Sequence, residues 1–262
     1  MKRFGCLFVV FALFLFSCQK DAGNSTLNIN ISDEIQLELW EALSVNQRFL
    51  HLRLSTIDDL ECENYTISYS VNTADQRISV SINDLIAPTV CIPGMAPGTG
   101  LISLGAVDPN LYTIEINLKN NQIINKGILN VFSDKIKLDM QTDYGIQFPY
   151  TTLLRMPENT IWGYIDFMDN SADEEAIGQD IYETLGPLTN TLVLPSGEYG
   201  HFKIIDQNIE SIKIDHADRN ENVFLLEQTA TKTEFESALE EIRNRYDSAL
   251  SVHLFFSDGS SL

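Results

Sequence analysis

Hydrophobic and polar residues alternate with a period of two along most of the chain from residue 27 to residue 140. In EIQLELW, Ile35, Leu37 and Leu39 fall on one side of an extended chain, and charged residues fall on the other. The same alternation recurs at 50–54, 65–71, 78–82, 112–118 and 136–140, with turn-forming sequences such as NTAD and KNNQ between the runs. This pattern predicts about seven half-buried strands and an antiparallel β-sandwich over residues 27–141.

One turn adds detail to the sandwich. DPNLY, residues 108–112, resembles the Asp-x-Gly-x-Tyr turn of immunoglobulin-like domains, which implies an immunoglobulin-like sandwich and a bond from the Tyr112 hydroxyl to nearby backbone. Asn110 stands at the glycine position, and Ile114 stands where the cysteine of antibody domains would lie. Because Ile114 replaces that cysteine, the antibody-type disulfide is excluded. The resemblance implies no activity, because many functions share this architecture.

The pattern changes after residue 141. Residues 142–158 contain two prolines and no sustained periodicity, which is typical of a linker. Beyond them, 160–167 is predicted to be a strand, 171–186 a helix with Ser171 or Asp173 near its cap, 191–205 a hairpin, 231–246 a second helix capped by Thr231 or Thr233, and 251–256 a closing strand. This order predicts a smaller α+β domain over 159–262, with a ferredoxin-like arrangement as one option.

The N-terminus has the zones of an export signal. A basic start at Lys2 and Arg3 precedes an apolar run over 4–16, which is shorter than the roughly 20 residues that span a bilayer. LFSC, residues 15–18, resembles the lipobox of bacterial lipoproteins, which implies that 1–17 are removed and that Cys18 carries lipid. The alternative is an ordinary secretory peptide with an incidental cysteine.

The residues after Cys18 concern location. QKD at 19–21 resembles the tag of surface-exported lipoproteins of the Bacteroidota, which implies an outer-membrane protein facing the cell exterior. Residues 18–26 are small and polar, as in a flexible tether. The predicted partners are the membrane, through the lipid, and an envelope protein or a glycan.

The net charge of the processed chain bears on which partners it can bind. Without residues 1–17 the chain keeps 15 basic and 37 acidic side chains, a net charge of 15 − 37 = −22. Such an acidic chain disfavours nucleic acid as a partner.

Of the four cysteines, Cys62 and Cys91 remain once Cys6 is removed and Cys18 is lipidated. An even pair in an exported chain predicts a disulfide, with two buried thiols as the alternative.

Candidate chemistry is sparse, and no catalytic or cofactor motif is present. Asp166, Asp169 and Asp173 offer oxygen ligands for calcium, yet capping and the dipole of the following helix already explain acids there, so no metal is predicted. Trp162 and Tyr164 suggest stacking on a sugar, although a core role is the favoured interpretation. The sequence thus predicts non-enzymatic binding or envelope structure. The alternatives are a carboxylate-dependent hydrolase using Asp166 and a carbohydrate-binding protein, both acting through the C-terminal domain.

Overall fold

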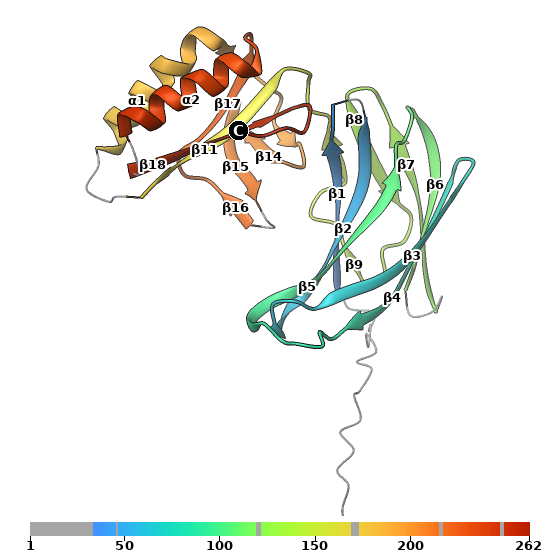
Figure 1. The fold of residues 1–262 in the computed structure, drawn as a ribbon. Helices are drawn as coiled ribbons and strands as arrows, with labels where there is room; N and C mark the ends of the chain where they lie inside the picture. Colours follow the sequence, from blue (N-terminus) through green and yellow to red (C-terminus); the bar gives the residue numbers. More distant parts are fainter. Residues whose placement is uncertain (1–33, 46, 119–121, 169–172, 215–216, 247–248) are drawn as a thin grey trace, which may run out of the picture.

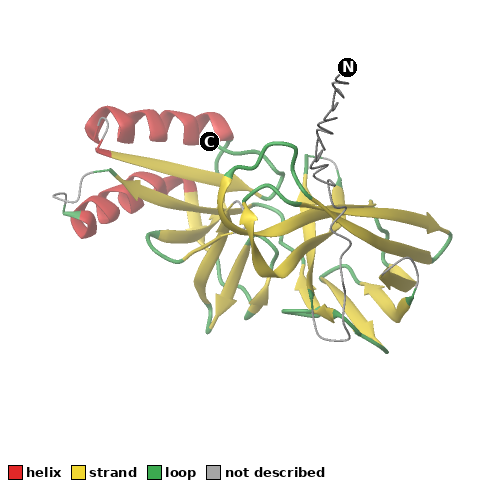
Figure 2. Cartoon of the chain, turned by 90° about the horizontal axis from the view of Figure 1, so that it is seen from below, coloured by secondary structure: helices red, strands yellow, loops and turns green. Residues whose placement is uncertain are grey.

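The computed structural model describes residues 34–262 except 46, 119–121, 169–172, 215–216 and 247–248. The predicted signal peptide (1–17), Cys18 and the tether (18–26) lie outside the described residues. Strands account for 58 % and helices for 14 % of the structure, which confirms a β-rich fold. Figures 1 and 2 show a strand-rich N-terminal part beside a C-terminal part in which two helices lie on a smaller sheet.

The N-terminal part consists of strands joined by short turns. Its strands are β1 (Ile35–Leu43), β2 (Arg48–Cys62), β3 (Thr66–Ala74), β4 (Arg77–Ile86), β5 (Pro93–Gly105), β6 (Asn110–Leu118), β7 (Ile123–Val131), β8 (Lys135–Met140), β9 (Ile146–Gln147) and β10 (Thr152–Leu154).

Alternation in the sequence becomes a one-sided core. Leu37 and Leu39 of β1 are buried and lie opposite Leu54 and Leu52 of the antiparallel β2. Successive side chains of a strand point to opposite faces, so the intervening polar residues point away from this core. The predicted strands from 35 to 140 are confirmed. The sheet is not wholly antiparallel as predicted, because β4 pairs in parallel with β6, β3 with β5 and β1 with β9.

The sheet of the N-terminal part curls around its core. Its strands are hydrogen-bonded in the order β9-β1-β2-β5-β3-β4-β6-β7-β8-β10, and one continuous hydrophobic cluster lines the inside. Near the ends of this order, β1 lies against β10, and the Tyr150 hydroxyl donates to the Leu39 carbonyl at 2.7 Å. The segment 142–158, predicted to be a linker, thus carries β9 and β10 and helps to close the sheet.

The C-terminal part mixes helices and strands. Its elements are β11 (Thr160–Phe167), α1 (Glu174–Leu185), the short 3-10 helix η1 (Gly186–Leu188), β12 (Thr189–Thr191), β13 (Gly197–Glu198), β14 (Phe202–Ile205), β15 (Asn208–Ile214), β16 (Ala217–Arg219), β17 (Val223–Gln228), α2 (Lys232–Tyr246) and β18 (Leu250–Phe256).

Four of these strands form a separate antiparallel sheet in the order β12-β17-β11-β18. Both helices cover one face of it (Figure 1), where Ile181 and Leu185 of α1 meet Phe235 and Ile242 of α2 in a second hydrophobic cluster. Neither described helix is long and apolar enough to cross a membrane.

The predicted helix starts are confirmed where they can be seen. The Asp173 carboxylate accepts a hydrogen bond from the Ala176 amide at 3.2 Å, which caps α1. Before α2, the Glu234 carboxylate accepts from both the amide and the hydroxyl of Thr231, at 2.8 and 2.7 Å. Ser171, the alternative cap of α1, lies outside the described residues.

The remaining strands of the C-terminal part extend the first sheet. β13 pairs in parallel with β10 at Leu153 and Glu198, and β14, β15 and β16 follow outward from it. The predicted hairpin over 191–205 is therefore shorter, comprising β13 and β14 alone. These strands cover the face of β11 opposite the helices, so all six residues from Thr160 to Ile165 are buried.

Candidate functional site

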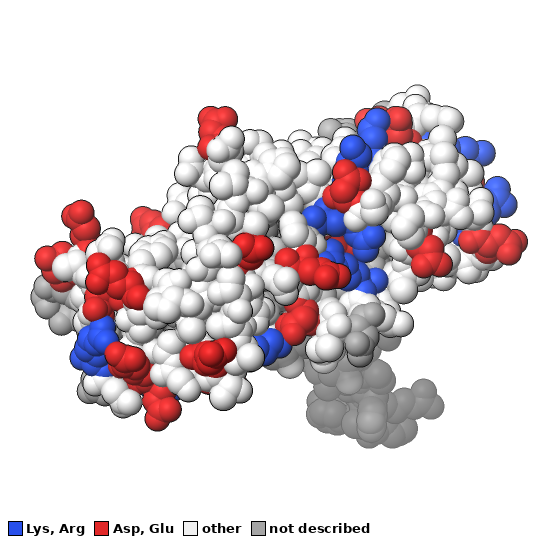
Figure 3. Space-filling view, turned by 90° about the horizontal axis from the view of Figure 1, so that it is seen from above, with Lys and Arg blue, Asp and Glu red and all other residues white. Residues whose placement is uncertain are grey.

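A cavity of about 680 Å³ opens where the two parts of the chain meet. Its wall combines the turn between β1 and β2, the loop between β5 and β6, the segment after β10 and the C-terminal turn. Figure 3 views the molecule from the end at which β1 finishes, and it shows Lys and Arg side chains gathered in a band across this face. Hydrogen-bonding side chains in the wall include Ser44, Gln47, Arg48, Arg155, Asn159 and Gln228.

Two arginines in the wall share one buried carboxylate. Arg155 places Nη2 2.7 Å and Nε 3.0 Å from Glu41 Oε1, and Arg48 Nη1 lies 3.3 Å from Glu41 Oε2. The Glu41 side chain is 5 % exposed, whereas those of Arg48 and Arg155 are 22 % and 16 % exposed. Two guanidinium groups against one carboxylate leave one positive charge in excess within this trio, while Asp108, Glu158 and Asp258 also line the cavity.

The position of Glu41 follows from the register of β1. Ile35, Leu37 and Leu39 point into the core, so period two directs Glu41 inward as well. A buried carboxylate is costly unless it is paired, and the two arginines supply that pairing. Sequence reasoning missed this site, although the signal was present as an acid at a core-facing position of the alternating run.

Acidic side chains in the same wall are compensated or exposed. Asp258 Oδ2 lies 2.5 Å from Lys232 Nζ, and the Ser260 hydroxyl donates to Asp258 Oδ1 at 2.7 Å. Although burial raises the pKa of Asp258, these hydrogen bonds hold it below its ordinary value. Asp108 and Glu158 are exposed at the rim.

A second charged cluster lies between β1 and β15. Lys213 Nζ is 3.4 Å from Glu38 Oε2, 3.8 Å from Glu198 Oε2, and 5.0 Å from the centre of the Tyr150 ring. Burial raises the pKa of Glu198 and the pKa of Tyr150. Cavities of about 370 and 450 Å³ flank this cluster and share Glu38, Lys213 and Asp218. The cluster joins residues 175 positions apart and thereby fastens the two parts together.

Three tilted aromatic rings lie beside Glu41 and Lys213. The His201 ring lies between Trp40 and Trp162, with centroid separations of 5.4 and 5.2 Å. Its Nε2–H donates to the Glu41 carbonyl at 2.8 Å. Burial lowers the pKa of His201 to about 4, so the ring is neutral at pH 7.

The two aromatic candidates from the sequence are internal. Trp162 and Tyr164 are 4 % and 8 % exposed. Trp162 packs on Phe202, while Tyr164 stacks on His253 at 4.5 Å and lies 4.2 Å beneath the Arg219 guanidinium. Neither ring presents a face to a sugar, because β11 is covered on both sides.

The acidic candidates are not brought together as a metal site. Asp166 pairs with Arg219 through one oxygen and lies 3.5 Å from His253 Nε2 through the other. Asp173 caps α1, and Asp169 lies outside the described residues. Within the part of the chain that is described, no group of three or more His, Cys, Asp and Glu is placed to hold a metal ion.

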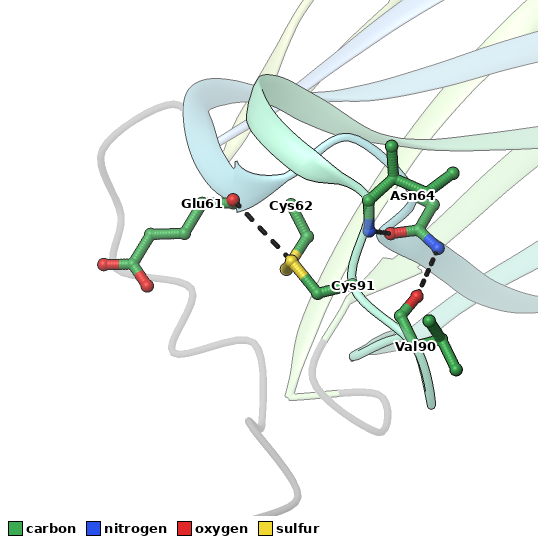
Figure 4. The surroundings of a disulfide bond; sticks show 6 residues. Glu61, Cys62, Asn64, Val90 and Cys91 are labelled. Atoms are coloured by element: carbon green, nitrogen blue, oxygen red, sulfur yellow. Dashed lines mark hydrogen bonds between the residues drawn. A yellow bond between two sulfur atoms is a disulfide. The ribbon is translucent and has the colours of Figure 1, made fainter.

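The predicted pairing of Cys62 with Cys91 is confirmed. The two sulfurs are bonded, and the Cα atoms lie 5.3 Å apart. Figure 4 shows the bond at the end of β2, where the loop between β4 and β5 folds back.

Comparison of the chain with protein-family models, with curated proteins and with solved structures gives no match. Among the groups described, the arginine pair lines the 680 Å³ cavity, and Arg155 Nη1 also lies 3.4 Å from the Phe132 carbonyl oxygen, to which it donates.

Proposed function

We propose that this chain is a lipid-anchored envelope protein with a non-enzymatic binding role at the cell surface. LFSC at 15–18 supports the anchor at Cys18. The Cys62–Cys91 bond supports export, since disulfides persist in oxidising compartments. Protease added to intact cells should digest the protein together with a known surface marker. Survival of the protein while the marker is digested contradicts external display.

The proposal includes an immunoglobulin-like sandwich over 27–141. The Tyr112 hydroxyl donates to the Asp108 carbonyl at 3.1 Å, and this contact supports the corner implied by the DPNLY turn. It also includes a ferredoxin-like C-terminal domain. That assignment is supported by the chain order β11-α1-β12-β17-α2-β18 and by both helices lying on one face, with β13–β16 as an insertion.

The ligand proposed for the 680 Å³ cavity is an acidic glycan. The observation that carries this proposal is the pair Arg48 and Arg155 held on the buried Glu41 in the cavity wall. Guanidinium groups bind carboxylates through two parallel hydrogen bonds, and a pair already oriented by Glu41 loses little freedom on binding. The neighbouring amides and rim carboxylates suit the hydroxyls of a sugar.

A glycan array with acidic and neutral members tests the ligand, followed by titration calorimetry on the acidic members that bind. Arg48→Gln and Arg155→Gln should each weaken binding about tenfold, the effect of losing one charge-assisted hydrogen bond. Glu41→Gln should also weaken binding, because it removes the carboxylate that orients both guanidinium groups. Arg243→Gln, which alters an exposed arginine of α2, is the matched control and should change nothing.

Two results contradict the cavity as the ligand site. The first is equal binding of acidic glycans and their neutral methyl esters. The second is unchanged affinity in both arginine variants, with thermal melting confirming that they are folded.

A hydrolase acting through Asp166 is the second candidate. The contact that favours it is the 3.5 Å approach of His253 Nε2 to Asp166 Oδ2, an acid–base pair in which both side chains are about one third exposed. Asp166→Asn should abolish hydrolysis of any glycan that the array identifies, if this candidate is correct. Binding without turnover in the unaltered protein favours the first proposal.

A further inference from the structure

Four large apolar side chains are exposed within ten residues around the disulfide. Ile86, Val90, Ile92 and Met95 are 50 %, 75 %, 52 % and 64 % exposed. We call these four residues the apolar tip. They lie at the end of β4, in the following loop and at the start of β5, where Figure 4 shows the Val90 side chain projecting from the fold. Soluble proteins expose large apolar side chains singly as a rule, so four within ten residues at one end of the strands single out this segment.

The apolar tip is held firmly. The Cys62–Cys91 bond ties its loop to β2. The Asn64 side chain donates to the Val90 carbonyl at 2.9 Å and accepts from the Ile92 amide at 3.1 Å, while the Glu63 amide donates to the Ile92 carbonyl at 3.0 Å. A surface ordered before binding loses little entropy when a partner docks.

The end of β2 beside the tip is acidic. Asp58, Asp59, Glu61 and Glu63, on or next to the neighbouring end of β2, are exposed. Arg77 is the one basic residue in the sequence from 54 to 118. It begins β4, whereas the tip begins where β4 ends, about 30 Å away along the strand. The four acids thus form an acidic rim on the β2 side of the apolar tip.

We propose that the apolar tip docks a partner protein whose binding face has an apolar pocket rimmed by Lys and Arg. Complementary charge around an apolar centre fixes the register of an interface and speeds encounter. A second copy of this chain would bring an acidic rim against an acidic rim.

A lipid surface is the main competing occupant. The Ile57 amide donates to the Glu34 carbonyl at 3.1 Å, so the described chain begins beside β2, the strand that ends at Cys62 next to the tip. The proposed lipid anchor at Cys18 precedes this point in the sequence. The acidic rim opposes this occupant, because anionic lipid surfaces attract basic segments and repel acidic ones. Charge thus favours a basic protein over a membrane.

Site-specific photo-crosslinking in intact cells that make the full lipidated chain tests the proposal. A benzophenone amino acid at Val90 should yield a discrete protein adduct, and the same group at Val193, which is 60 % exposed, should not. Asp58→Lys with Asp59→Lys should reduce the Val90 adduct about tenfold, because like charges then face each other. The matched control is Glu236→Lys with Glu240→Lys on the exposed side of α2, which makes the same charge change elsewhere and should leave the adduct intact.

Several outcomes overturn the proposal. One is the absence of a protein adduct at Val90, and others are an adduct with lipid, with a second copy or with the chain itself. If the yield of the Val90 adduct is unchanged by the charge reversal at Asp58 and Asp59, or falls equally in the α2 control, the acidic rim does not select the partner. Binding of the purified chain to phosphatidylcholine or phosphatidylglycerol vesicles, lost on Val90→Asp, assigns the tip to a membrane instead.

Discussion

Replacing both Cys62 and Cys91 by Ala should destabilise the chain mainly by freeing its unfolded state. The cysteines are 29 residues apart in sequence, and for a loop of that size the chain-entropy relation gives about 3.6 kcal/mol. Both cysteines are replaced so that no lone thiol is left to form adducts. Because unfolding of a chain of this size shifts by about 2 to 4 °C per kcal/mol, the thermal midpoint should fall by about 7 to 14 °C.

The assays are urea unfolding and thermal melting of the soluble chain that begins after Cys18, both monitored by tryptophan fluorescence and circular dichroism. Unaltered protein in reductant should approach the midpoint of the double variant, which separates loss of the crosslink from loss of packing. A double variant within about 0.5 kcal/mol of the unaltered protein refutes the reasoning, as does free thiol in the denatured, unreduced protein.

Two further predictions concern packing and pH. Gly163→Ala should lower the free energy of unfolding in urea by about 1 to 3 kcal/mol, because a Cβ there would lie 2.1 Å from the His253 carbonyl oxygen. The control is Gly178→Ala on α1, which has open space around it and should be neutral or stabilising. Equal effects of the two substitutions contradict the packing described. Lowering the pH from 7 to 4 should cost about 3 kcal/mol at His201, because the unfolded ring takes up a proton near pH 6.5 whereas the folded ring resists protonation until about pH 4. This loss should be missing in His201→Gln, and parallel stability curves for the two proteins contradict it.

Local pattern accounts for much of the fold. The alternation around Leu37 and Leu39 predicts β1 because one face of that strand is covered and the other is not. The caps at Asp173 and Thr231 predict the helix starts because they act within one turn of the chain. Both signals are short-range, so they can be read from the sequence alone.

The features that were missed depend on contacts between distant segments. β11 is buried on both faces because β14 and β15, which come later in the chain, cover its second face. No pattern in the sequence around Trp162 predicts that contact. The Arg155–Glu41 pair joins residues 114 positions apart, and the Lys213–Glu38 pair joins residues 175 apart. The alternating pattern shows that Glu41 is an acid at a core-facing position, which is unusual. It does not show that Arg48 and Arg155 pair with it.

Palmitate labelling of cells that make the protein tests the central claim, lipid anchoring at Cys18, most directly. The unaltered protein should incorporate label and run at the size of a chain without residues 1–17. Cys18→Ala should carry no label and should remain unprocessed or wrongly processed. Equal labelling of the two proteins, or an unlabelled unaltered protein, contradicts the anchor and with it the proposed role at the cell surface.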